Sequence, residues 1–243
     1  MAEERSPGGS EIKRYELRER DIEPAVGDPE LIDALSSHLA RYHGQEGDVF
    51  HELVSDVLHV DLLHAAPTDD LPFHTLMTCG MSERPMAAPA ELPDARYAEL
   101  MLRLPPEWPL SREAFEDESV YWPLRVLKFL ARFPHEYETW LWHGHTVPHG
   151  DPPEPFAPST ELCGAILLPP VLGPDGFERA EAAGREVEIL ALIPLHADEM
   201  ELKLRKGSDE LVERLDEAGL SELLDPKRAS VAPRRRGLFG RRR

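Results

Sequence analysis

The sequence predicts an α+β fold, in which a mostly antiparallel mixed sheet packs against helices. Three observations support this class. Several segments alternate apolar and polar residues, as half-buried strands do, and they follow one another like hairpins. Other segments space apolar residues as helices do. No regular strand–helix–strand alternation, which would predict a parallel sheet, is present.

Four helices are predicted. The first covers residues 29–43: Asp28 can cap it, Pro29 suits its first turn, and Gly44 ends it. Its apolar stripe consists of Leu31, Ile32, Leu35, Leu39 and Tyr42. The other three helices are expected at residues 122–133, 197–205 and 209–218, with Pro134 ending the second.

Strands are predicted at residues 58–64, 73–79, 97–104, 162–168 and 187–193. In the third of these, Glu99 and Arg103 alternate with apolar residues and are expected on the opposite face. The proline-rich segment 143–159 and the segment 173–184 are expected to be loops.

The chain of 243 residues is long enough for one large domain with short extensions. We expect a flexible leader over residues 1–27, one domain over residues 28–225 and a disordered basic tail over residues 226–243. The start of the chain lacks the apolar stretch of a secretory signal, and no apolar run is long enough for a membrane span. These features predict a cytoplasmic protein.

Charge is distributed unevenly along the chain. The net charge is −19, yet residues 227–243 hold eight basic and no acidic residues, which leaves −27 on residues 1–226. A net charge of −27 on residues 1–226 repels nucleic acid and anionic membranes. We therefore expect neither as a stable partner. The best charged partner would be a basic protein. Leu238 and Phe239, between two arginine triplets of the tail, suit only transient membrane contact.

Two groups that contain histidines are candidate metal sites. His143, His145 and His149 lie within seven residues of a loop, and three imidazoles plus water can hold a catalytic zinc ion. This loop is the basis of an alternative function, a metal-dependent hydrolase. On the strand expected at 58–64, by contrast, His59 and Asp61 point to one face and His64 to the other.

Two cysteines and a group of aromatic residues complete the candidates. Cys79 could act as a nucleophile beside His74 or His143, but small buried cysteines are the usual case, and Cys163 lies in an apolar run. No phosphate-binding glycine loop or nucleophile elbow occurs. All four tryptophans fall between residues 108 and 142, where Trp140 and Trp142 are candidates for contact with a partner.

An ordered set of short segments resembles the suppressor-of-fused domain, in its compact bacterial form. The most specific are Gly-Met-Ser at 80–82, Glu-Leu at 99–100 and Trp-Pro at 122–123. Further matching segments lie at residues 60–63, 66–68, 75–79, 85–86, 98–105, 124–132, 144–148, 190–194 and 199–202. Their order and spacing extend from about Leu31 to Leu224.

The resemblance implies a mixed α/β fold and a role in protein binding. The animal relative has a second domain and holds a short peptide of a transcription factor as an added β-strand. The resemblance covers only the first of these two domains, so we expect no two-domain clamp here. Bacterial relatives resemble immunity proteins that neutralise toxins. The animal pattern has an aspartate where this chain has His145.

From the sequence we therefore expect a non-catalytic protein-binding domain that neutralises or regulates a partner, with a basic toxin as the candidate. We expect no catalytic residue, no cofactor and no metal. The sequence identifies neither the partner-binding residues nor the partner, and the metal-dependent hydrolase with His143, His145 and His149 stays the alternative.

Overall fold

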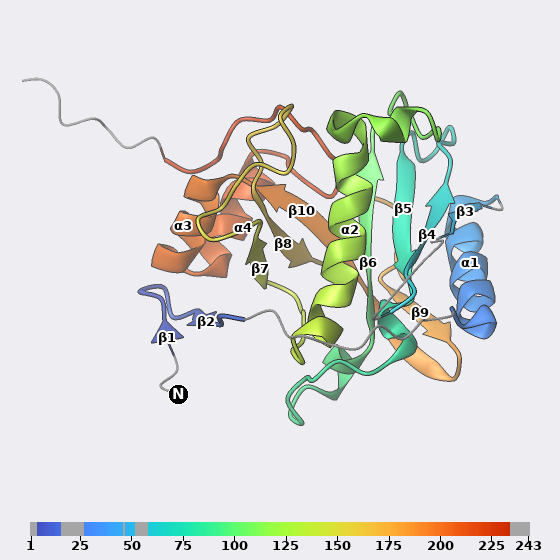
Figure 1. Ribbon diagram of the computed structural model, residues 1–243, viewed down its shortest axis with the longest axis horizontal. Helices are drawn as coiled ribbons and strands as arrows, with labels where there is room; N and C mark the ends of the chain where they lie inside the picture. Colours follow the sequence, from blue (N-terminus) through green and yellow to red (C-terminus); the bar gives the residue numbers. More distant parts are fainter. Residues whose placement is uncertain (1–3, 16–26, 46, 52–57, 234–243) are drawn as a thin grey trace, which may run out of the picture.

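The computed structural model describes residues 4–15, 27–45, 47–51 and 58–233, which build a mixed sheet covered by helices on both faces (Figure 1). Along the sheet the strands are ordered β3-β4-β5-β6-β10-β8-β7, and β9 also pairs with β10. Only β6 and β10 are parallel. The α+β class with a mostly antiparallel sheet is therefore confirmed. The strands are β3 Asp48–Phe50, β4 Asp61–Ala65, β5 His74–Cys79, β6 Ala98–Leu104, β7 Thr146–Pro148, β8 Gly164–Leu168, β9 Arg179–Ala182 and β10 Arg185–Leu195.

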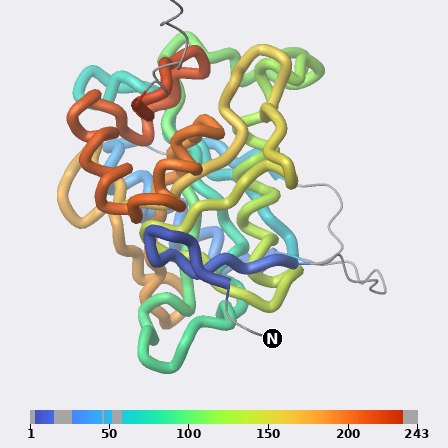
Figure 2. Tube along the Cα trace, turned by 90° about the vertical axis from the view of Figure 1, so that its left-hand side faces the viewer, coloured from blue at the N-terminus to red at the C-terminus, as the bar shows by residue number. Residues whose placement is uncertain are grey.

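Helices cover the two faces unequally. The α-helices are α1 Pro29–His43, α2 Glu118–Glu136, α3 Ala197–Lys206 and α4 Ser208–Glu217. Three short 3₁₀ helices are η1 Met81–Glu83, η2 Pro93–Arg96 and η3 Ala114–Glu116. One core cluster joins α2 to one face of the sheet, whereas two others join α1 and the α3–α4 pair to the opposite face. Figure 2 shows the sheet from its β7 end, with α3 and α4 on one side.

The first helix forms where the sequence predicts it, over Pro29–His43. The Asp28 carboxylate accepts a hydrogen bond from the Glu30 N–H at 3.0 Å. Gly44 ends the helix with φ of 71°, a left-handed conformation that glycine adopts without steric cost. Leu31, Leu35 and Leu39 are buried against the sheet, so the predicted stripe is the packed one.

The central helix α2 is longer than predicted at both ends. It begins at Glu118 rather than Trp122, because Asp117 caps it by accepting from the Ser119 N–H at 2.8 Å. It also continues through Pro134, which the sequence analysis takes as its end. Proline within a helix removes one backbone hydrogen bond. Burial of the apolar face of α2 against the sheet offsets the free energy lost with that bond.

Three short strands of the main sheet are not predicted from the sequence. β7 lies in the proline-rich segment and β9 in the segment 173–184, both expected as loops, and β3 precedes the first predicted strand. Strands of three or four residues are too short for alternation to identify them. Their pairing partners, β8, β10 and β4, fix them in the sheet.

β6 forms where the sequence predicts a strand, with Glu99 and Arg103 on one face, but neither of its faces is exposed. All of its side chains are buried, including those of Glu99 and Arg103. Helices cover both faces of the sheet, so each charged group needs an internal partner. Arg103 Nη1 donates to Glu222 Oε1 at 2.6 Å, and the backbone of Glu222 accepts from the Arg103 N–H at 2.9 Å. This pair fastens the segment after α4 to the central strand.

Segments near both ends of the chain contact the rest of the domain. In the region expected as a leader, β1 (Glu4–Arg5) and β2 (Glu11–Ile12) form a hairpin. The Gly8 N–H donates to Leu204 at the end of α3, and this hairpin crosses near β7 in Figure 2. In the region expected as a tail, Arg228 forms a buried ion pair with Glu199. Leu238 and Phe239 lie outside the described residues.

Within the part of the chain that the structure describes, no helix is both long enough and apolar enough to cross a membrane.

Candidate functional site

The three histidines of the candidate metal loop have separate environments. His145 packs edge-on against Trp140, with ring centroids 4.5 Å apart. His143 Nε2 lies 3.4 Å from Glu188, and His149 Nδ1 lies 2.8 Å from the Glu154 carbonyl oxygen. No group of three or more potential ligands that could hold a metal ion occurs among the described residues.

His145 is also poorly suited to acid–base chemistry at neutral pH. Burial lowers its pKa to about 4, and the nearby Lys203 and Lys13 act in the same direction. The imidazole is therefore neutral at pH 7. It supports the Trp140 side chain, and both are covered by residues from the N-terminal segment: Lys13 Nζ lies 5.8 Å from the centre of the Trp140 ring.

The second histidine group divides as the alternation of the strand predicts. His59 Nε2 lies 2.9 Å from Asp61 Oδ1. His64 of β4 instead lies beside His74 of the neighbouring strand β5, with 2.9 Å between His64 Nε2 and His74 Nδ1. His51, which the sequence analysis did not consider, lies on the other oxygen of Asp61 at 3.0 Å. The carboxylate of Asp61 is buried between these two imidazoles. The three predicted residues do not converge on one point.

Neither cysteine has the properties of a nucleophile. Both are free thiols and buried. Burial raises the pKa of Cys79, and the neighbouring Glu99 and Asp61 carboxylates raise it further. Burial also raises the pKa of Cys163. Because the thiolate is the reactive form, both groups are poor nucleophiles at neutral pH.

β7 is the last strand in the order and forms one of the two edges of the main sheet, opposite β3. The His145 carbonyl accepts from Leu167, and the His149 N–H donates to Cys163. These residues therefore bond inward, and by antiparallel alternation Thr146 and Pro148 direct their backbone groups outward. Pro148 has no N–H, which limits this edge to a short stretch.

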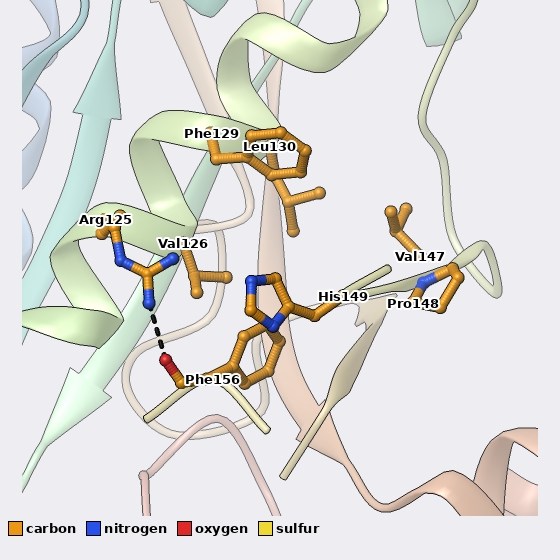
Figure 3. Close-up of a pocket in the computed structure, with 8 residues that line it drawn as sticks. All are labelled: Arg125, Val126, Phe129, Leu130, Val147, Pro148, His149 and Phe156. Carbon is orange, nitrogen blue, oxygen red and sulfur yellow. Dashed lines mark hydrogen bonds between the residues drawn. The ribbon is translucent and has the colours of Figure 1, made fainter. Parts of the chain in front are cut away.

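An apolar groove runs beside this edge, between α2 and β7 (Figure 3). Its volume is about 190 Å³. The helix contributes Arg125, Val126, Phe129 and Leu130; β7 and the following loop contribute Val147, Pro148, His149 and Phe156. Phe129 is 43% exposed, an unusual state for a large aromatic side chain, and it lies at the mouth of the groove.

Rigid contacts hold the walls of the groove. Arg125 Nη2 donates to the Phe156 carbonyl at 2.6 Å, which ties the helix to the loop (Figure 3). The Phe156 ring stacks on the buried Trp122 ring, with centroids 5.2 Å apart. The groove is therefore largely formed before any partner binds.

The sequence does not predict this groove, although it contains one signal for it. Phe129 lies on the polar side of the apolar stripe that Leu124, Leu127 and Leu130 define, where an aromatic residue has no core to fill. Trp140 and Trp142, the candidates named from the sequence, are partly buried against the core. Arg125 and Val147 carried no signal of their own.

Comparisons with known proteins identify related folds and one family. The family described as Suppressor of fused protein (SUFU) matches residues 56–229. Among curated proteins, no match is found.

Solved structures with a similar fold come from proteins of the same description. A SUFU homologue from Neisseria gonorrhoeae FA 1090 is 17% identical, with a TM-score of 0.59, and the match covers 85% of this chain and 98% of that one. The structure of a Sufu–Fu complex is 15% identical, with a TM-score of 0.58 and coverages of 84% and 93%. Drosophila Suppressor of Fused is 15% identical, with a TM-score of 0.58 and coverages of 88% and 54%. At these identities the likeness establishes the fold alone.

Proposed function

Because this chain belongs to the suppressor of fused protein family, we propose that it is a non-catalytic domain that binds an extended segment of a partner protein along the β7 edge. A solved structure with the same fold is described as a complex of Sufu with Fu, a relative engaged with a protein partner. The proposal extends that behaviour to this chain.

One observation carries the proposal: the outward backbone of Thr146 lies beside a preformed apolar groove with an exposed Phe129 at its mouth. An added strand gains affinity from backbone hydrogen bonds and specificity from pockets that receive its alternate side chains. The β7 edge and the groove provide both elements at one place.

The proposal includes the neutralisation or regulation of the partner, in the manner of an immunity protein, in the cytoplasm. The acidic body supports a partner that is basic overall, such as a basic toxin, because opposite charges accelerate association. Association should then slow steeply as salt is added. The metal-dependent hydrolase gains no support, since His143, His145 and His149 have separate contacts.

Affinity capture from the cells that produce the protein tests the site. Phe129→Glu places a charge at the mouth of the groove, and Leu92→Glu is a matched control because both side chains are 43% exposed. We expect one partner to be retained by the wild type and by Leu92→Glu and lost by Phe129→Glu. A partner held equally by all three baits would move the binding surface elsewhere.

A further inference from the structure

The two faces of β7 differ in chemistry. Thr146 pairs with Ile166, which belongs to the core under α3 and α4, and Val147 pairs with Ala165, which belongs to the core under α2. Side chains on an added strand would alternate in the same way. Every second side chain of the added strand would therefore enter the apolar groove. The side chains between them would lie beside Thr146 on the α3 face.

On the α3 face, Thr146 lies against a buried lysine. Lys203 of α3 is 6% exposed, and its Nζ donates to Thr146 Oγ1 at 3.1 Å. Among the residues that the structure describes, no carboxylate forms an ion pair with Lys203. An ammonium group can donate three hydrogen bonds, so two remain for another acceptor.

Two further basic groups lie nearby, each beside an acidic group: Lys13 Nζ lies 3.8 Å from Glu11 Oε1, and His143 Nε2 lies 3.4 Å from Glu188 Oε1. Lys203 and Lys13 are the charges that act on His145, together with His143 of the same loop. Burial alone lowers the pKa of Lys203, to about 8, which is the result expected for a cation without a carboxylate at hand. Lys203 therefore differs from Lys13 and His143, each of which lies beside a carboxylate.

We propose that the segment bound at β7 alternates apolar and acidic side chains, with an apolar side chain in the groove and a carboxylate on the Thr146–Lys203 pair. This inference rests on the proposed function and adds the chemistry of the partner. A residue directly opposite Thr146 on an added strand has its Cβ about 5 Å away, within reach of Lys203 for an aspartate or glutamate.

The groove sets the size of the apolar side chain. At about 190 Å³ it lies below the range of about 300–1,000 Å³ that is usual for small-molecule sites. It therefore accepts one large aliphatic or aromatic side chain rather than a whole organic ligand. The acidic body repels a strongly acidic protein at long range, so the partner carries its carboxylate within a segment of an otherwise neutral or basic chain.

A displayed library of random decapeptides, selected against the immobilised full chain, tests this chemistry. Parallel selections use Lys203→Gln and, as a matched control, Lys206→Gln, because Lys206 is on the same helix and exposed. We expect the wild type and Lys206→Gln to enrich peptides with apolar residues at every second position and aspartate or glutamate between them. Lys203→Gln should lose the acidic preference.

A second measurement leaves the protein unchanged. In the best selected peptide, replacement of the glutamate by glutamine should weaken binding to the wild type about tenfold, because a hydrogen bond to a charged group is lost. The same replacement should have no effect on binding to Lys203→Gln.

The outcomes separate this inference from the function on which it rests. Selected peptides that Phe129→Glu releases, but that are neutral or basic between their apolar positions, would overturn the acidic preference and leave strand addition in place. A selection that yields no peptide sensitive to Phe129→Glu would overturn both.

Discussion

The carboxylate of Glu99 holds Ser82 through two hydrogen bonds: Oε1 accepts from the Ser82 N–H at 2.9 Å and from its hydroxyl at 2.7 Å. The same carboxylate accepts from the Gly80 N–H at 3.0 Å and from the Thr78 hydroxyl at 2.6 Å. Two of the most specific sequence segments, Gly-Met-Ser at 80–82 and Glu-Leu at 99–100, are thus one buried network.

Removal of this carboxylate should destabilise the fold strongly. Glu99→Ala leaves four donors without their acceptor in a fully buried site, so we expect the free energy of unfolding to fall by about 3 kcal/mol or more. Urea unfolding measures this loss. Glu107→Ala, at an exposed position, should change the stability by less than about 0.5 kcal/mol. Equal effects of the two variants would contradict the role of the network.

Lys203 should make stability depend on pH in the alkaline range. Its pKa is lowered to about 8 in the folded state, so between about pH 8 and 10.5 the unfolded chain holds a proton that the folded chain has released. The stability of the wild type should therefore rise over this interval relative to Lys203→Met.

At pH 7, Lys203→Met should itself raise the free energy of unfolding by about 1–3 kcal/mol, because a buried charge without a carboxylate partner is removed. Chemical unfolding of both proteins at pH 7 and pH 9.5 measures the two effects. A constant difference between the two proteins across this pH range would show that Lys203 does not titrate as described.

His43 should make the fold sensitive to acid. Burial lowers its pKa to about 4, with Arg103 and His64 acting in the same direction. Between about pH 6.5 and 4 the unfolded chain binds a proton that the folded chain does not, so stability falls as the pH falls. We expect His43→Phe to lose about 1–3 kcal/mol less than the wild type between pH 7 and pH 4.5 in urea unfolding. Parallel losses in both proteins would rule out this contribution.

The sequence predicts elements well where a cap, an apolar stripe or the local composition marks them. The helix over residues 29–43 follows from its cap and its apolar stripe, and the strand over residues 73–79 follows from its composition. For β6 it predicts the strand but not the burial of both faces, because alternation of charged and apolar residues normally marks a half-buried strand. Glu99 and Arg103 are instead satisfied by Ser82 and Glu222, which are distant in the sequence.

The candidate site was less accessible to prediction. Nearby histidines in the sequence suggest a metal centre, yet His143 and His149 have separate partners in the fold. The groove, by contrast, joins Phe129 of α2 to Val147 of a strand of three residues that no periodicity reveals. A site formed by an edge strand depends on which strand is last in the sheet, and strand order is a tertiary property.

Hydrogen exchange of individual amides in the complex with a captured partner or selected peptide tests the central claim most directly. Strand addition at β7 should slow exchange of the Thr146 amide at least about tenfold, because its N–H gains an acceptor. The amides of β3, at the opposite edge of the sheet, should not change. Protection of β3 with no change at Thr146 would contradict the proposed site.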